Sequence, residues 1–279
     1  MNENPDATVF IGGGNMATAL ISGRIAAGAN ANGFRVVEPS PSQRDSLAAR
    51  FAGIRVFHEV TAEAVAAADL VVFAVKPQQM AVAAKALAPY VRDVGAVLTI
   101  AAGIRTSDLS RWLGGYRRIV RAMPNTPALI GAGISGVYAA PDVATDAREA
   151  SAMILRAAGE VLWFDNEAAL DGVTGVSGSG PAYVFYFLES LEEAARDLGF
   201  SPDDARKLAY ATFSGAIELA QKSDANPATL RVQVTSKGGT TERALATLDA
   251  QRVKASIVAA VKDAAFRARE MGEEFGKDP

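Results

Sequence analysis

Three glycines near the amino terminus form the first stretch whose spacing indicates a chemical role. The β-forming run Val9–Ile11 precedes the loop Gly12–Gly14, and a helix-forming run begins at Met16. Glycine lets the backbone approach an anion closely, and the first turn of a helix supplies unpaired N–H donors and a partial positive charge. The spacing of Gly12, Gly14 and Ala17 fits the alanine-ended variant of the dinucleotide fingerprint. We therefore expect this loop to bind the diphosphate of a dinucleotide.

Two segments rich in glycine and hydroxyl residues lie in the second half of the chain. They are Gly175–Ala182 and Val234–Thr241, and each precedes a predicted helix. Backbone N–H groups at a helix N-terminus form a ready anion site. Because the first loop already accounts for a diphosphate, a second site of this kind indicates an anionic substrate, most simply a carboxylate.

The segment after the second predicted strand bears on the choice of cofactor. Glu38 stands where an acid commonly accepts hydrogen bonds from the adenosine ribose, which favours NAD. Ser40, Ser42 and Arg44 could together hold a 2′-phosphate, which favours NADP. The sequence leaves this choice open.

Three further strand ends carry candidate contacts for the rest of the cofactor. Lys76 could lie along the cofactor or simply project into water, and the small residues Ala101–Gly103 would let a flat ring lie against the backbone. Prolines on both sides of Asn125 and Thr126 restrict their loop, and a fixed amide suits the carboxamide of nicotinamide. The alternative interpretation of this last segment is a structural turn.

The composition excludes several classes of catalyst and partner. The 279-residue chain has no cysteine and a single histidine, His58. A disulfide, a thiolate nucleophile, a paired-histidine metal site and a Ser-His-Asp triad therefore cannot be built, and we expect no metal. A formal net charge of −3 gives no electrostatic reason to expect nucleic acid or an anionic membrane as partner. No apolar run reaches the ~18 residues of a membrane span, so we expect a cytoplasmic protein.

Residues 1–165 alternate short β-branched runs with helix-forming stretches. This pattern predicts repeated βαβ units and a parallel sheet. The continuously apolar run Leu70–Val75 is typical of a sheet covered on both faces. We expect strands at Thr8–Ile11, Phe34–Val37, Ile54–Phe57, Leu70–Val75, Ala96–Ile100, Arg118–Ala122, Ile134–Ala139 and Glu160–Trp163.

Residues 166–279 are predicted to form an all-α domain. Start signals for helices occur at Ser201–Asp204 and at Asn226–Pro227. We expect helices at Pro181–Leu198, Pro202–Lys222, Pro227–Val234, Thr241–Asp249 and Arg252–Glu274. Apolar residues around much of the circumference of these helices favour a homodimer built through this half of the chain.

Five motifs together resemble the pyrroline-5-carboxylate reductase family. They are Phe10–Met16, Ala74–Pro77, Arg121–Pro127, Val176–Tyr183 and Thr235–Thr241. The resemblance extends from the first predicted strand to the last helix. It implies an α/β Rossmann-type dinucleotide-binding domain followed by an all-α dimerisation domain, with rings of dimers common. It also implies reduction of the cyclic imine 1-pyrroline-5-carboxylate to L-proline with NAD(P)H, the last step of proline biosynthesis.

The resemblance assigns cofactor contacts residue by residue. Ser40 would meet the adenosine phosphate or ribose. Asn125 is added because its proline-restricted loop suits the nicotinamide carboxamide. The residues expected to contact NADP(H), or alternatively NAD(H), are Ile11, Gly12, Gly13, Gly14, Asn15, Met16, Ser40, Ala74, Val75, Lys76, Pro77, Ala101, Ala102 and Asn125.

The last motif is assigned to the substrate. The group expected to hold the substrate carboxylate comprises Ser236, Gly238, Gly239, Thr240 and Thr241. The Thr241 hydroxyl would lie near the ring nitrogen, and Asp224 matches an acid that usually faces that nitrogen and is commonly glutamate. Lys237 stands where the family normally has proline, which loosens the loop and adds a charge.

The implied reaction is hydride transfer from C4 of the nicotinamide to the C=N carbon. Since no histidine or cysteine is available as an acid, we expect the imine to arrive protonated, or to take its proton through water or Thr241, while Asp224 stabilises positive charge. Two other functions remain open. One is an NAD(P)H-dependent reductase of another small imino or keto acid, and the other is a non-catalytic dinucleotide-binding sensor, for which Lys237 is the single hint.

Overall fold

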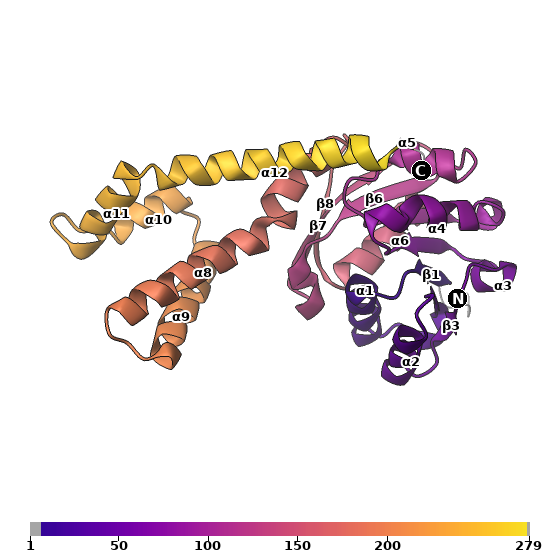
Figure 1. Cartoon of the computed structure of the whole chain (residues 1–279), viewed down its shortest axis with the longest axis horizontal. Coiled ribbons are helices and arrows are strands. Elements are labelled where there is room, and N and C mark those ends of the chain that lie inside the picture. Colours follow the sequence, from indigo (N-terminus) through magenta and orange to yellow (C-terminus); the bar gives the residue numbers. More distant parts are fainter. Residues whose placement is uncertain (1–6, 278–279) are drawn as a thin grey trace. The chain divides into compact units, whose positions relative to one another are not determined.

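The computed structural model describes residues 7–277, which form two compact units (Figure 1). One unit contains residues 7–179 and 263–277, and the other is Gly180–Lys262. The first unit thus continues past residue 165 and also includes the end of the last helix. The expected domain boundary between residues 165 and 166 stays a prediction.

The first unit is built on one eight-stranded sheet with the order β3-β2-β1-β4-β5-β6-β7-β8. All eight predicted strands are present, with ends that differ by at most two residues. Their bounds are β1 Thr8–Ile11, β2 Phe34–Val37, β3 Arg55–Phe57, β4 Leu70–Phe73, β5 Ala96–Thr99, β6 Ile119–Met123, β7 Gly133–Ala139 and β8 Gly159–Trp163.

Two strands, β7 and β8, correct the expectation of a parallel sheet, because both run opposite to the other six. β7 runs antiparallel to β6, whereas β8 is parallel to β7. A parallel neighbour requires a crossover of about a dozen residues or more. Residues 124–132 are too few for such a crossover and contain only the short 3₁₀ helix η4, Thr126–Ile130. The chain therefore turns back beside β6.

Helices cover both faces of this sheet and create two apolar cores. Successive residues of β1 enter different cores, because Val9 and Ile11 belong to one cluster and Phe10 to the other. This confirms the inference from the continuously apolar strands. The helices of this unit are α1 Asn15–Ala26, α2 Pro41–Arg50, α3 Ala62–Val65, α4 Met80–Leu87, α5 Thr106–Trp112, α6 Thr145–Arg156 and α7 Ala169–Val173.

The rest of the chain is helical, as predicted. Ser201 and Asn226 cap their helices, since their side chains accept hydrogen bonds from the Asp204 and Thr229 N–H groups. The helices are α8 Gly180–Asp197, α9 Pro202–Gln221, α10 Pro227–Gln233, α11 Thr240–Ala250 and α12 Val253–Phe275. No helix within residues 7–277 is long and apolar enough to span a membrane.

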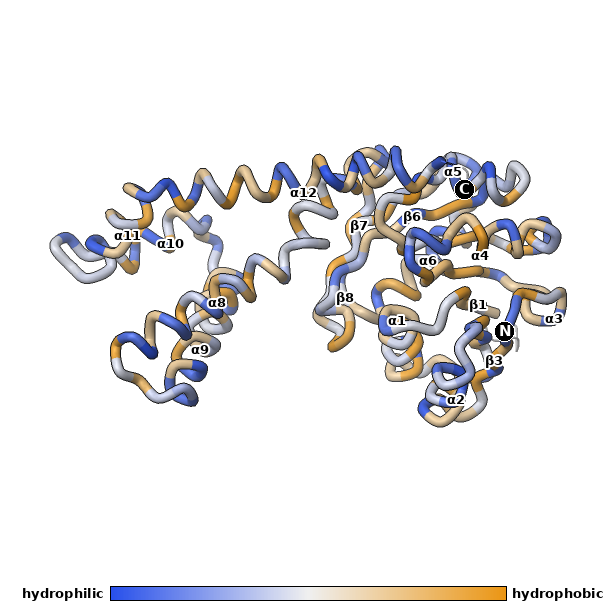
Figure 2. Tube along the Cα trace, viewed as in Figure 1, coloured by the Kyte–Doolittle hydropathy of each residue, from blue (hydrophilic) through white to orange (hydrophobic). Residues whose placement is uncertain are grey.

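The helices of the second unit keep many large apolar side chains in contact with water. Phe185 and Tyr186 on α8 are 62% and 69% exposed, and Ile217 on α9 is 57% exposed. Figure 2 shows apolar stretches in orange along α8, α9 and α12. Exposed apolar surface of this extent marks an interaction surface.

Candidate functional site

Gly12 makes the turn that brings two predicted cofactor segments together. It follows β1 directly, with φ at +96°, a conformation that favours glycine. A Cβ at this position would lie 2.8 Å from the Ala74 carbonyl oxygen and 2.8 Å from Cγ1 of Val75. The Ala74 N–H also donates to the Ile11 carbonyl at 2.8 Å. The close approach of the two segments therefore depends on the missing side chain of Gly12.

The other two glycines of the loop have different environments. A Cβ on Gly13 would lie 2.6 Å from Cδ1 of Leu47, so Gly13 allows α2 to pack closely. Gly14 is the exposed N-cap of α1 and has no atom within 4 Å of a built Cβ. The N-terminus of α1 is thus open beside Gly14 and Asn15, as a diphosphate site requires.

Glu38 is tied to the backbone of the glycine loop. Its two carboxylate oxygens accept hydrogen bonds from the Gly13 and Ser40 N–H groups, each at 2.9 Å. The Gln43 amide nitrogen donates to the Gly13 carbonyl at 2.6 Å. Both Glu38 oxygens therefore already have one donor each from the protein. The role of Gln43 was not predicted, because nothing local distinguishes it from a solvent-exposed helical glutamine.

The hydroxyl and guanidinium groups that favour NADP lie together at the start of α2. Ser40 caps this helix, with its Oγ accepting from the Gln43 N–H and lying 3.1 Å from Oγ of Ser42. One Arg44 nitrogen donates to the Glu38 and Pro39 carbonyls at 2.8 Å each. A helix N-terminus that carries two hydroxyls and a guanidinium suits a phosphate dianion.

The side-chain amide of Asn125 forms hydrogen bonds with two other segments of the protein, at Ile134 and at Ser177. Its oxygen accepts from the Ile134 N–H at 2.9 Å, and its nitrogen donates to the Ser177 carbonyl at 3.2 Å. Pro181 has no N–H, so in a regular helix the Ser177 carbonyl would lack its usual donor. The amide of Asn125 supplies that donor. Contact between Asn125 and the nicotinamide stays a prediction, and one amide hydrogen beyond these two bonds is available for it.

The segment Gly175–Ala182 does not present a helix N-terminus, so its predicted anion site is wrong. Thr174–Gly178 forms a π-helical turn directly between α7 and α8. The Ser179 N–H, for example, donates to the Thr174 carbonyl at 2.8 Å. The backbone donors of this segment are therefore used by the helix itself. Gly178 allows Met123 to pack against this turn, because a Cβ on Gly178 would lie 2.7 Å from Cε of Met123.

The second predicted anion loop does have an exposed helix N-terminus. Gly239 is the N-cap of α11, and Gly238 has φ at +74°. A Cβ on Gly239 would lie 2.5 Å from Oγ of Ser236, so the glycine lets that hydroxyl lie against the loop. The Gly238 N–H donates to the Glu242 carboxylate at 2.7 Å. A carboxylate of the protein therefore occupies a donor that we expect a substrate carboxylate to use.

The remaining substrate candidates lie in the same unit, where Asp224 and Lys237 are exposed and Thr241 is half-buried. Thr241 is in the first turn of α11, and its hydroxyl has no hydrogen-bond partner among residues 7–277. Asp224 lies in the turn between α9 and α10, and Lys237 precedes the two glycines of the loop. Within the described part of the chain, no three histidine, cysteine, aspartate or glutamate side chains are grouped as a metal site would require.

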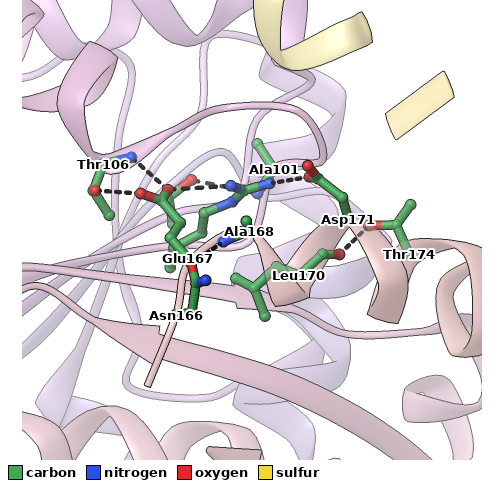
Figure 3. A network of polar contacts seen from close by, with 10 residues as sticks. Ala101, Thr106, Asn166, Glu167, Ala168, Leu170, Asp171 and Thr174 are labelled. Atoms are coloured by element: carbon green, nitrogen blue, oxygen red, sulfur yellow. Dashed lines mark hydrogen bonds and ion pairs between the residues drawn. The ribbon is translucent and has the colours of Figure 1, made fainter. Parts of the chain in front are cut away.

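A buried ionic network at the carboxyl end of the sheet was not predicted (Figure 3). The side chain of Arg121 on β6 is 5% exposed and lies 3.1 Å from Glu167 and 3.6 Å from Asp171. Glu167 also accepts hydrogen bonds from the N–H and hydroxyl of Thr106. An arginine within the apolar run Ile119–Met123 is the one signal in the sequence that could have indicated a buried charge.

Comparison with known proteins gives consistent matches over both parts of the chain. Residues 167–271 match the family model described as pyrroline-5-carboxylate reductase dimerisation, and residues 8–103 match NADP oxidoreductase, coenzyme F420-dependent. The pyrroline-5-carboxylate reductase of Pseudomonas aeruginosa is 44% identical over 96% of this chain and 97% of its own. That of Arabidopsis thaliana is 35% identical over 95% of both chains.

Solved structures agree with these sequence matches. A pyrroline-5-carboxylate reductase from Coxiella burnetii has a TM-score of 0.88 and 36% identity, and covers 96% of this chain and 99% of its own. The pyrroline carboxylate reductase of Plasmodium falciparum, solved with NADP bound, has a TM-score of 0.86 and 27% identity with the same coverage.

Proposed function

The chain belongs to the pyrroline-5-carboxylate reductase family, and on this premise we propose that it reduces 1-pyrroline-5-carboxylate to L-proline with NADPH, the last step of proline biosynthesis. The observation that carries the proposal is the 44% identity over almost the whole length of the Pseudomonas aeruginosa relative. A match of that extent includes the dinucleotide loop at Gly12–Gly14 as well as the glycine loop at Ser236–Thr241.

NADPH is proposed as the cofactor because of the residues at the start of α2. Ser40, Ser42 and Arg44 place two hydroxyls and a guanidinium at one helix N-terminus, while the Glu38 carboxylate is held by the loop backbone. The Plasmodium falciparum relative was solved with NADP bound. The remaining cofactor contacts, from Ile11–Met16 to Ala101 and Ala102, are proposed on the same basis. NADH is the alternative.

The loop Ser236–Thr241 is proposed to hold the substrate carboxylate. The Gly238 and Gly239 N–H groups, the Ser236 hydroxyl and the first turn of α11 are groups that stabilise an anion. A substrate carboxylate at this loop would displace the Glu242 carboxylate from the Gly238 N–H. Lys237 adds a positive charge nearby, which opposes the repulsion from Glu242.

Thr241 and Asp224 are proposed as the catalytic residues. When bound, NADPH supplies the hydride for the C=N carbon. The Thr241 hydroxyl can donate to or accept from the ring nitrogen, because it has no partner among residues 7–277. The Asp224 carboxylate stabilises the positive charge of the protonated imine, which makes the carbon a better hydride acceptor. Asp224 need not transfer a proton itself.

A spectrophotometric assay tests the function. Purified protein should oxidise NADPH when 1-pyrroline-5-carboxylate is added and release L-proline, with higher kcat/KM for NADPH than for NADH. Open-chain 2-oxo acids serve as comparison substrates. Activity on those acids without activity on the cyclic imine would indicate a reductase of different specificity. Tight NADPH binding without oxidation by any imine would indicate a sensor.

A homodimer in the cytoplasm is proposed as the working form, with rings of dimers as the larger assembly. The dimerisation model matches residues 167–271, and side chains such as Phe185, Tyr186 and Ile217 are exposed in the single chain. Sedimentation velocity should give at least a dimer at micromolar concentration. A monomer there would contradict the proposed assembly.

A further inference from the structure

The loop Ile100–Arg105 joins β5 to α5 at the carboxyl end of the parallel strands. Ala101 is buried, whereas Ala102 is partly accessible to a ligand. The proposed function places Ala101 and Ala102 against the cofactor, and the inference below rests on that placement. Hydride transfer to one carbon requires the nicotinamide to be held in one position. The backbone position of a loop that contacts the nicotinamide therefore affects the reaction more than the loop's small side chains do.

The first half of the loop is held by its own strand and by the last helix. The Ala101 N–H donates to Oγ1 of the buried Thr99 at 3.3 Å. Gly103 has φ at +72°, and a Cβ there would lie 3.0 Å from Cβ of Met271 and 3.3 Å from the ring of Phe275 on α12. These contacts restrict the first half of the loop, and at its far end Arg105 lies 3.9 Å from Glu273 of α12.

Glu167 fixes the backbone at that far end as a distant cap of α5. Arg105 occupies the N-cap position but makes no side-chain capping bond. The Glu167 carboxylate instead accepts from the Thr106 N–H at 2.8 Å and from the Thr106 hydroxyl at 2.7 Å. A serine or aspartate in place of Arg105 would satisfy this helix locally. Here the cap comes from a residue 61 positions away along the chain.

The Glu167 carboxylate is itself fixed by a buried charge. Arg121 lies beside Thr99 in the strand register and is 3.1 Å from Glu167, with its second nitrogen 3.6 Å from Asp171 (Figure 3). A buried guanidinium paired with two carboxylates is expensive to desolvate and contributes little net stability. It does orient the carboxylate, because Arg121 donates a charge-assisted hydrogen bond to one oxygen of Glu167 at 3.1 Å.

We propose that Glu167 is a positioning residue for the nicotinamide half of the cofactor. Oriented by Arg121, it fixes the Thr106 end of the loop and thereby the backbone of Ala101 and Ala102. The adenosine half of the cofactor depends on a different group, Ser40 and Arg44 at the start of α2. Loss of the Glu167 cap should therefore weaken binding of the nicotinamide half of the dinucleotide and leave binding of the adenosine half unchanged.

Binding of NADPH and of its fragment 2′,5′-ADP to Glu167→Gln tests this proposal. Both dissociation constants are measured by fluorescence or calorimetry on the full chain. We expect NADPH to bind about tenfold more weakly, with the affinity for 2′,5′-ADP within twofold of wild type. Glu149→Gln is the matched control, because Glu149 is an exposed carboxylate that is also paired with an arginine, Arg156. It should change neither affinity.

Thr106 provides a second pair of variants if Glu167→Gln does not fold. Thr106→Val removes the hydroxyl donor and should raise the dissociation constant of NADPH about threefold. Thr106→Ser keeps the donor and should bind NADPH with wild-type affinity. Unchanged NADPH affinity in these variants would overturn the proposal, as would an equal loss for NADPH and 2′,5′-ADP. None of these measurements requires turnover. Failure of the imine assay would therefore contradict the proposed reaction without affecting this result.

Discussion

Replacing Gly12 with alanine is expected to remove measurable NADPH binding at micromolar protein concentrations. The new Cβ would lie 2.8 Å from the Ala74 carbonyl oxygen, a backbone atom that cannot rotate away. Crowding of this kind costs about 1–3 kcal/mol, and the positive φ costs a further ~1–2 kcal/mol for a residue with a Cβ. Relief requires the loop and the Ala74–Val75 segment to separate, and both are proposed cofactor contacts. We expect affinity to fall at least about 100-fold.

Gly28→Ala is the matched control for this experiment. Gly28 has nearly the same φ, +95°, but no atom lies within 4 Å of its built Cβ. It therefore carries the backbone penalty without the clash. Gly28→Ala should lower the melting temperature slightly and keep NADPH affinity, as measured by thermal denaturation and fluorescence titration. Wild-type affinity in Gly12→Ala would show that the turn is not part of the dinucleotide site.

Thr241→Ala is expected to lower kcat/KM for 1-pyrroline-5-carboxylate by about 100-fold. A hydrogen bond to a centre whose charge changes in the transition state is typically worth about 2.7–4 kcal/mol. Because Thr241 is not among the proposed cofactor contacts, the dissociation constant of NADPH should not change. The measurement is a steady-state assay of the imine at saturating NADPH, together with a binding titration.

Two companion variants separate chemistry from helix stability. Thr241→Ser keeps the hydroxyl and should retain most activity. Thr247→Ala, six residues further along α11, removes a hydroxyl that only donates to the Arg243 carbonyl, so it should leave kcat/KM unchanged. Wild-type turnover in Thr241→Ala would disprove the assigned role and move attention to Asp224 or to a protonated imine in solution.

Much of the fold could be predicted because its signals are local. Each strand is a short run rich in β-branched residues. The N-caps Ser201 and Asn226 mark the starts of their helices through hydrogen bonds to N–H groups three residues further along the chain. The direction of β7 could not be predicted from its composition. It depends on the connection at residues 124–132, which is too short for a parallel crossover. This length decides the direction of β7 only if β7 pairs with β6, and that pairing is known only from the structure.

The candidate site also has a part that local sequence signals predict and a part that depends on the tertiary structure. The sequence by itself determined the glycine turn Gly12–Gly14, the glycine loop Ser236–Thr241 and the family, because glycine spacing and hydroxyl clusters are patterns of a few neighbouring residues. Binding of a dinucleotide at the first loop stays a prediction. The helical course of Gly175–Ala182 was missed, since glycine and proline are normally signs of a break in a helix. Only the tertiary structure decided that the Asn125 amide supplies the donor that Pro181 lacks.

The charge network of Figure 3 was beyond the reach of sequence analysis for a similar reason. Arg121, Glu167 and Thr106 come from a strand, a loop after the last strand and the start of a helix. Glu167 and Thr106 are ordinary in their own segments, and only Arg121, within an apolar strand, is unusual. Their meeting is a consequence of strand order and chain crossing, which place residues 46 and 61 positions apart within hydrogen-bond distance. Local residue types determined which chemistry is available to this protein, and long-range packing decided which of those groups hold one another in place.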